Sequence, residues 1–389
     1  MVMPFHSPKV SDPDAMLARY PILRLLPAQL AALGHPVTVL VHAAVDARRE
    51  QGNVCYEFIR PQRFTVVSGN VIHRWKPRYG PAYYQPATRL ARRLQRLHPE
   101  VVHFFGLTMD IQLAIVARVA ERLKAPLVVH YHGGVPGQSR RLRLLQRHNV
   151  KRISRVLFTT GVQAEMWLSG GLGLQRQQIA LVLETSSPFQ QIDKDTARQR
   201  TGMHGDPVYL SAGRLNEVKD PLTMLGGFVR IRESQPRARL YLHYLSDEML
   251  EEVQAFIEQR PQLRDAVELR GRAPWDEMGA IYSSADFLLQ ASRREWSGLA
   301  ILEAMSCGCI PVVSHIPAFE IMTSGGLFGR LFKPGDADGL ASAALEISSE
   351  ERLQLSEAIR LHFDDKLSFQ ALANDVERVY LDAAKTHPT

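Results

Sequence analysis

The chain has 389 residues, of which 45% are hydrophobic and 22% are charged, which is the composition of an ordinary soluble globular protein. This length exceeds the size at which one hydrophobic core usually divides, so we expect two domains. No apolar run approaches the roughly 20 residues of a membrane-spanning helix, and the first residues lack the pattern of a signal peptide. The three cysteines (Cys55, Cys307 and Cys309) lack metal-binding spacing, so the expected compartment is the reducing cytoplasm.

The net charge of +7 is unevenly distributed. Residues 1–190 carry 25 Lys and Arg against 10 Asp and Glu, whereas the remainder carries 22 against 30. Much of the excess lies in two predicted helices, one with Arg89, Arg92, Arg93 and Arg96 on one face and one between residues 140 and 155. Two interpretations stay open: solvated helix faces, or contact with an anionic membrane surface or anionic glycan. No nucleic-acid partner is expected, because no recognition motif accompanies the charge.

In the first half, apolar strand-like runs alternate with helical patterns, which predicts a parallel sheet with crossover helices. One helix is expected from Ala15 to Leu33, followed by Gly34. The expected strands are Val2–His6, His35–His42, Val101–Gly106, Pro126–Gly133, Val156–Thr160 and Ile179–Leu183. Together they define an N-terminal α/β domain over residues 1–190.

The polar stretch Ser186–Met203 lacks a core pattern, and we place the domain junction there. The second domain is expected over residues 200–365, and residues 368–385 form a last amphipathic helix. Its expected strands are Val208–Ala212, Arg239–Tyr244, Ala266–Leu269, Asp286–Ala291 and Cys309–Ser314. In open α/β sheets, ligands bind at the carboxyl ends of such strands.

Two carboxylates flank the start of a predicted helix between the last two of these strands. Glu295 lies in the loop before the helix and Glu303 about one and a half turns inside it, so both can face one ligand at different depths. Gly298 opens the helix, whose free N–H groups and partial positive charge suit a diphosphate. The absence of a Cβ at Gly298 lets the chain approach a ligand closely.

A second pair of candidate residues follows the strand Val208–Ala212. Arg214 and Lys219 lie five positions apart on the loop before the next helix, so they can converge on one diphosphate. Arginine binds phosphate bidentately, and lysine acts as a point charge. The other interpretation is a pair of solvated loop cations.

Metal sites are less favoured. His130 and His132 share one face of a strand, but no third ligand is apparent. The pairs Asp12/Asp14 and Asp336/Asp338 have D-x-D spacing, for which capping of the following helix is the favoured interpretation. No P-loop is present.

Together these motifs resemble the retaining GT-B glycosyltransferases of the GT4 group. The matching elements are Glu295-x-x-Gly-Leu-x-x-x-Glu303-Ala-Met-x-Cys-Gly, Gly213-Arg-Leu with Lys219, and His132-Gly at a strand end. The resemblance implies two Rossmann-like doubly wound α/β domains that face each other across a cleft. The first domain would lie on the acceptor side, the second would hold the donor, and residues 368–385 would cross back onto the first.

The resemblance also implies an activity. It is the metal-independent transfer of a sugar from a UDP-, GDP- or ADP-linked donor to a hydroxyl, with retention of the anomeric configuration. The acceptor would be a glycan, a lipid-linked molecule or a small molecule in cell-envelope polysaccharide or glycoconjugate synthesis, with peripheral contact at the inner face of the membrane. No cofactor is expected. The alternative is a related protein that epimerises a nucleotide sugar or only binds one.

By the same resemblance, Arg214 and Lys219 hold the diphosphate and assist its departure, and the Gly298 and Leu299 amides add to that site. Glu303 would bind the ribose and Glu295 the sugar hydroxyls. The remaining implied site residues are His132, beside the sugar, and Arg272, near the nucleobase.

The chain departs from the family on the acceptor and sugar side. The loop from His6 to Asp14 has no glycine, and Glu184 replaces the first residue of the usual Asn-Gly-Val-Asp. His243-Tyr-Leu-Ser replaces trailing glycines, and Ser297 stands where many relatives have Phe. The diphosphate-binding elements are retained, so the expectation concerns the donor diphosphate rather than a particular acceptor.

Overall fold

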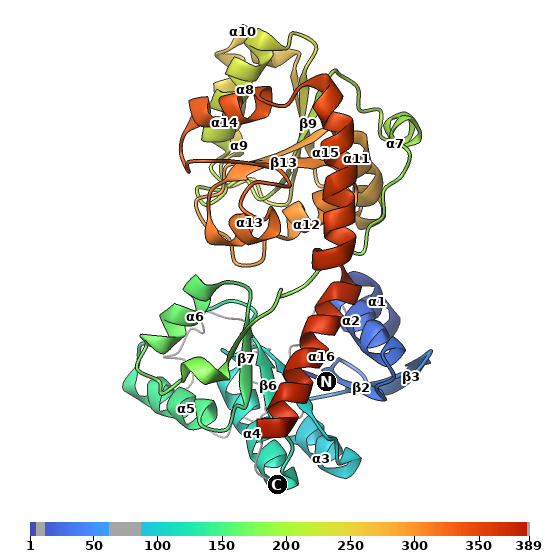
Figure 1. The fold of residues 1–389 in the computed structure, drawn as a ribbon, viewed down its shortest axis with the longest axis vertical. Helices are drawn as coiled ribbons and strands as arrows, with labels where there is room; N and C mark the ends of the chain where they lie inside the picture. The colour runs from blue at the N-terminus through green and yellow to red at the C-terminus, as the bar shows by residue number, and fades with distance from the viewer. Residues whose placement is uncertain (5–11, 62–86, 387–389) are drawn as a thin grey trace. The chain divides into compact units, whose positions relative to one another are not determined.

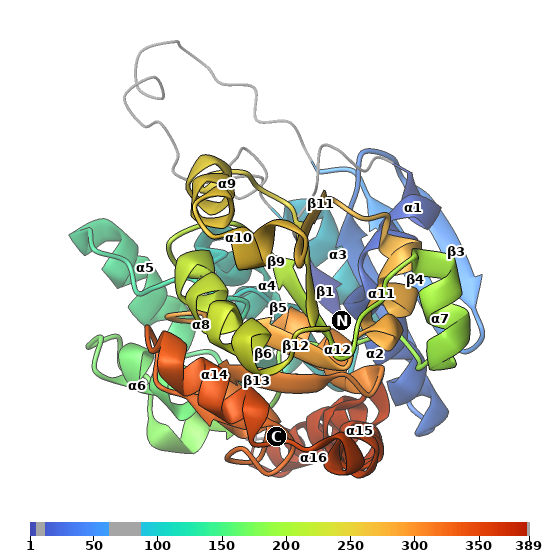
Figure 2. The same ribbon diagram turned by 90° about the horizontal axis from the view of Figure 1, so that it is seen from above.

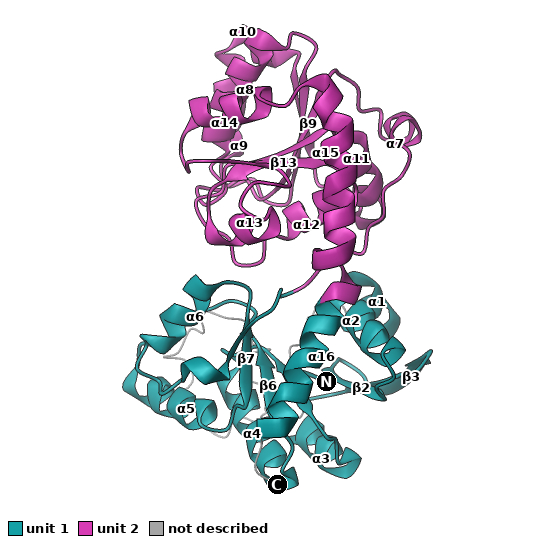
Figure 3. Cartoon of the chain, in the orientation of Figure 1, with its two compact units in different colours: residues 1–184, 372–389 teal, residues 185–371 magenta. Residues whose placement is uncertain are grey.

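The structure, a computed structural model, describes residues 1–4, 12–61 and 87–386. The chain divides into two compact units, Met1–Glu184 with Leu372–Thr389, and Thr185–Ala371 (Figure 3). The first unit therefore contains both ends of the chain, and the second is one continuous segment. Most of the loop between His6 and Asp14 lies outside the described residues.

The first unit contains a mainly parallel sheet. Its described strands lie in the order β3-β4-β2-β1-β5-β6-β7-β8, and only β3 runs antiparallel to its neighbour. The strands are β1 (Val2–Met3), β2 (Val37–His42), β3 (Ala47–Gln51), β4 (Val54–Ile59), β5 (Val102–Phe105), β6 (Leu127–His130), β7 (Arg155–Phe158) and β8 (Ile179–Leu181). The helices are α1 (Pro13–Arg19), α2 (Pro21–Ala32), α3 (Thr88–Leu97), α4 (Asp110–Leu123), α5 (Arg140–Val150), α6 (Gly161–Leu168) and most of α16 (Phe369–Thr386).

The prediction of one helix from Ala15 to Leu33 is wrong, because the chain forms α1 and α2 with a break at Tyr20. Proline disfavours helical geometry in the residue before it, and Pro21 follows Tyr20, whose backbone is non-helical at φ −117° and ψ 88°. Pro21 itself sits at the first position of α2, where its missing N–H costs nothing.

The last helix, α16, completes the first unit. Its apolar face, which includes Leu372 and Val376, is buried. The Tyr380 hydroxyl is hydrogen-bonded to the buried His103 at 2.6 Å, and Arg155 forms an ion pair with Asp382 at 2.7 Å. The C-terminal segment is thus an integral layer of this unit.

The second unit has a six-stranded parallel sheet within the described residues, in the order β11-β10-β9-β12-β13-β14. Its strands are β9 (Val208–Gly213), β10 (Arg239–Tyr244), β11 (Val267–Gly271), β12 (Phe287–Gln290), β13 (Ile310–Ser314) and β14 (Arg330–Phe332). Its helices are α7 (Lys194–Thr201), α8 (Pro221–Ser234), α9 (Leu250–Glu258), α10 (Pro261–Arg264), α11 (Met278–Ser284), α12 (Leu299–Ser306), α13 (Pro317–Met322), α14 (Ala337–Leu345) and α15 (Ser349–His362). Each predicted strand of this half is present within a residue or two.

Helices cover both faces of this second sheet (Figure 1). On one face α8 and α14 lie side by side, as both views show (Figures 1 and 2). They approach closely at Gly227, where a Cβ would lie 2.8 Å from the Ala337 carbonyl oxygen. On the other face α12 packs against α11 and α15. No helix in the described ranges combines the length and hydrophobicity that a bilayer crossing requires.

A buried carboxylate joins separate parts of the second unit. Asp286, at the start of β12, accepts from Lys194 at 2.7 Å, from Arg198 at 2.8 Å and from the Val208 amide at 2.8 Å. Burial alone would raise the pKa of Asp286, but Lys194, the Val208 amide and Arg198 together hold it below its ordinary value. This carboxylate therefore fixes α7 against the central strands β9 and β12.

We expect Asp286→Asn to lower the free energy of unfolding at pH 7 by about 2 kcal/mol. The partly buried Lys194 and Arg198 lose their counter-charge, and Arg352 loses one of its two carboxylate partners. The folded-state pKa lies below the unfolded value of about 3.9, so this stabilisation is present above that pH and is lost as the pH falls through the folded pKa. Urea denaturation from neutral to acid pH measures both effects. The control is Asp338→Asn, which removes an exposed ion pair with Arg230; an equal loss in both variants would contradict the assignment.

Candidate functional site

The candidate site lies where the strand order of the second sheet reverses. Strands β10 and β11 extend the sheet on one side of β9, and β12, β13 and β14 extend it on the other. Because β9 and β12 are parallel neighbours, the loops after Gly213 and Gln290 leave from the same edge. Such a reversal point is where ligands bind in open α/β sheets.

Gln290 connects the two loops. Its side-chain amide donates to the Ala212 carbonyl at 2.6 Å, and its Oε1 accepts from Lys219 at 3.4 Å. The side chain is almost fully buried, so these hydrogen bonds fix its orientation. Gln290 is not among the predicted site residues, and its signal in the sequence is that a polar residue ends an otherwise apolar strand.

Lys219 and Glu295 form an ion pair at this edge. The Glu295 carboxylate also accepts from the Ser292 hydroxyl at 3.1 Å. Both side chains of the pair are largely shielded from water, with exposed fractions of 18% and 15%. The structure thus brings together two of the predicted site residues that lie 76 positions apart in sequence.

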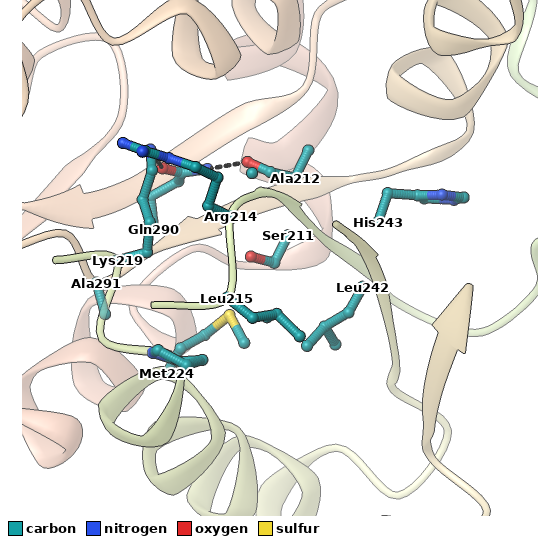
Figure 4. Close-up of a pocket in the computed structure, with 12 residues that line it drawn as sticks. Ser211, Ala212, Arg214, Leu215, Lys219, Met224, Leu242, His243, Gln290 and Ala291 are labelled. Carbon is teal, nitrogen blue, oxygen red and sulfur yellow. Dashed lines mark hydrogen bonds between the residues drawn. The ribbon is translucent and has the colours of Figure 1, made fainter. Parts of the chain in front are cut away.

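Arg214 lies beside this pair. It lines a small hollow with Lys219, Gln290 and the ends of β9 and β10 (Figure 4). The Arg214 side chain is exposed, and no ion-pair partner for it is found among the described residues. His243, at the carboxyl end of β10, points away from Arg214 and Lys219 (Figure 4), and burial lowers its pKa. The hollow therefore carries one paired and one unpaired cation.

The helix α12 begins as predicted. Gly298 precedes it with φ +56°, where a Cβ would lie 3.0 Å from the Phe319 ring, so both backbone conformation and space favour glycine. Leu299 opens the helix with a side chain 43% exposed. The first N–H groups of a helix have no intrahelical partner, so they are available to an anion.

Glu303 lies inside α12 and accepts a hydrogen bond from the Tyr282 hydroxyl at 2.8 Å. Burial raises the pKa of Glu303 to about 7, against the opposing effect of that hydrogen bond. Tyr282 was not identified from the sequence, because an interior position in α11 carries no sign of its partner.

The other two predicted site residues are not part of the lining of the hollow. Arg272 is exposed on the loop after β11 and does not line the hollow. His132 belongs to the first unit, where its Nδ1 lies 2.9 Å from a Glu184 carboxylate oxygen. Its Nε2 is buried without a hydrogen-bond partner in the described structure. Glu184, which replaces the first residue of the family's usual Asn-Gly-Val-Asp, is thus the hydrogen-bond partner of His132.

The partly exposed His132 ends a row of rings that also contains the buried His103, Phe105 and His130. Burial holds the pKa values of His103 and His130 well below the ordinary value, so both are neutral. Nowhere in the described ranges do three His, Cys, Asp or Glu side chains form a group suited to a metal ion.

Two family models match the chain, one for each half. The model described as glycosyl transferases group 1 matches residues 193–362, and that of the glycosyl transferase 4-like domain matches residues 21–182. Between them they cover most of both units, but not β1, α1, α16 or residues 183–192. Every site residue named above except Glu184 lies within the matched ranges.

Mannosylfructose-phosphate synthase from Agrobacterium fabrum is 28% identical over 51% of this chain and 46% of its own length. The chain spans about half the length of the curated relatives it matches, or less. Among solved structures, sucrose-phosphate synthase from Thermosynechococcus elongatus matches with a TM-score of 0.65 and 18% identity, over 97% of this chain and 94% of that one. Anabaena HepE in complex with UDP and glucose matches with a TM-score of 0.65 and 14% identity, over 98% of this chain and 100% of that one. At these identities the likeness to solved structures concerns the fold.

We expect Glu303→Gln to gain stability relative to the wild type as the pH rises. The unfolded carboxyl ionises near pH 4.3, whereas the folded one holds its proton up to about pH 7. The free energy of unfolding of the wild type therefore falls by about 3 kcal/mol between these two pH values. The neutral amide of Glu303→Gln still accepts a hydrogen bond from Tyr282, and the stability of this variant does not fall in the same way.

Urea denaturation of both proteins near pH 5 and near pH 8 measures this difference. The matched control is Glu233→Gln at an exposed position of α8. A Glu303→Gln variant that gains no more than the control between the two pH values would contradict the assigned pKa.

Proposed function

We propose that this chain, a member of the group 1 glycosyltransferases with the GT-B fold, transfers a sugar from a nucleotide-diphosphate sugar to a hydroxyl with retention and without a metal ion. One observation carries the proposal: Lys219 and Glu295 are in contact at the edge where β9 and β12 end, beside the unpaired Arg214. Two cations suited to a diphosphate, Arg214 and Lys219, thus lie at the same edge of the sheet as Glu295, a carboxylate suited to sugar hydroxyls.

Before a donor arrives, Lys219 and Glu295 neutralise each other, and Arg214 beside them stays unpaired among the described residues. A bound diphosphate replaces Glu295 as the partner of Lys219, and the freed carboxylate then accepts hydrogen bonds from sugar hydroxyls. As the bond to the diphosphate breaks, negative charge builds on the leaving oxygens. Lys219 and Arg214 stabilise that charge more in the transition state than in the ground state.

The remaining residues position the donor. The Gly298 and Leu299 amides at the start of α12 add donors for the diphosphate, and Glu303 binds the ribose hydroxyls. We assign Arg272, on the loop after β11, to the nucleobase. His132 is assigned to the transferring sugar, with Glu184 holding its ring orientation through Nδ1.

The names of the similar proteins support a choice of donor and acceptor classes to test first. Structures of the similar HepE contain UDP or UDP-glucose, which makes UDP-sugars the first donors to test. Several similar proteins are named for phosphorylated-sugar products, among them mannosylfructose-phosphate and sucrose-phosphate synthases, which makes sugar phosphates the first acceptors. A lipid-linked acceptor at the inner face of the membrane and a cytoplasmic location remain part of the proposal.

The test is nucleoside-diphosphate release from UDP-, GDP- and ADP-sugars with a panel of hydroxyl and sugar-phosphate acceptors, with and without EDTA. We expect release from one donor, unchanged by EDTA, with kcat/KM about 100-fold lower in Lys219→Ala and in Glu295→Ala. Lys333→Ala, which removes an exposed lysine, is the control. The anomeric proton signal of the product reports retention.

Release that requires a divalent cation would refute metal independence. Stabilisation by a nucleoside diphosphate without any transfer would favour the alternative of an epimerase or a binding protein. The donor-site assignment would fail if no nucleoside diphosphate raised the melting temperature.

A further inference from the structure

A second hollow lies in the first unit and shares no lining residue with the hollow at the candidate donor site. It is a groove of about 560 Å³ between α3 and the hairpin of β3 and β4. Phe58 and Ile59, both buried, form its apolar part, and arginines of α3 and β3 form its walls. Its volume lies within the usual range for small-molecule sites.

Two of the four arginines on α3 are held by carboxylates. Arg93 donates to both oxygens of Glu57 at 2.5 and 2.6 Å. Arg89 donates to Asp46 at 3.0 Å and to the Arg60 carbonyl at 2.9 Å. These contacts fix one wall of the groove. They also occupy Asp46 and Glu57, which are the carboxylates of the described lining.

Arg92 and Arg96 also line the groove, but no carboxylate of the described residues lies within ion-pair distance of either. They are one helical turn apart, where like charges destabilise a helix by a few tenths of a kcal/mol. Two guanidinium groups at this spacing can both bind one dianionic phosphate bidentately. Five arginines, Arg48 of β3 among them, and two carboxylates line the groove, which leaves three more positive than negative charges in the lining. Arg48 is paired with Glu50 outside the lining, so Arg92 and Arg96 are the arginines whose arrangement suits such a group.

A membrane surface fits this groove less well than a soluble ligand. Interfacial helices insert an apolar face between lipid headgroups. The apolar residues of α3, Leu90 and Leu94, are buried in the core instead. No large hydrophobic side chain of α3, β3 or β4 is exposed. The basic helix α5 differs, because its Leu144 is 65% exposed.

We propose that this groove binds the phosphate of a small soluble phosphomonoester, with Arg92 and Arg96 as its ligands and Phe58 and Ile59 beside the carbon skeleton. The inference stands on the first unit alone and holds whether or not the proposed transfer is correct.

Isothermal titration calorimetry of the full chain with glucose 6-phosphate tests the proposal, with glucose as the uncharged comparison. We expect binding of the phosphomonoester only, weakened about tenfold by the double substitution Arg92→Gln/Arg96→Gln. The matched control is Arg140→Gln/Arg141→Gln, which removes the same charge from two exposed positions of α5 and should change the affinity less than about twofold. Circular dichroism confirms that both variants fold.

Two further measurements exclude other sources of binding. In an Arg214→Ala/Lys219→Ala background, which removes the cations of the donor site, the affinity should be unchanged. Sedimentation with phosphatidic-acid vesicles should not distinguish Arg92→Gln/Arg96→Gln from its control. The proposal is overturned by absent binding to the wild type, by equal losses in the two arginine variants, by loss in the donor-site background, or by vesicle binding that depends on Arg92 and Arg96.

Discussion

The parallel pairing of β9 with β12 is the constraint on which the candidate site depends. It places the ends of two strands, far apart in sequence, at one edge of the sheet and brings the loop of Lys219 next to the loop of Glu295. Asp286 stabilises this pairing at the amino ends of the two strands, because its carboxylate accepts a hydrogen bond from the Val208 amide of β9. One buried charge at the amino end of β12 thus supports an ion pair at its carboxyl end.

Buried polar groups at this edge fall into two kinds. Gln290 is held by the backbone, and Lys219 and Glu295 neutralise each other, so little is left unsatisfied before a donor binds. Glu303 differs, because its burial without a cation favours the protonated form. The site therefore combines an ion pair, Lys219 with Glu295, at the proposed diphosphate position with a carboxyl group, Glu303, whose protonation depends on its surroundings.

The strands of both sheets, apart from β3, β4 and β14, and the positions of Gly298 and Glu303 on α12 could be predicted from strand and helix periodicity. The edge rule for parallel sheets predicted that ligands bind after such strands, whereas only the family resemblance assigned Lys219 and Glu295 to one site. Other features could not be predicted. The helical pattern is continuous through Tyr20, so it does not show the break there. The strand β3 consists mostly of charged residues, so it does not show the apolar alternation of a strand. The hydroxyl partner of Glu303 depends on how α11 packs against α12, which no local pattern encodes.

The path of the chain has a consequence for synthesis. Thr185–Ala371 is one continuous segment, whereas the unit before it is completed only by Leu372 onward, including Tyr380 against His103. During translation the second unit can therefore close while the first still exposes the apolar surface that α16 covers. The sheet of the first unit, although made before the second unit, is therefore completed after it by α16.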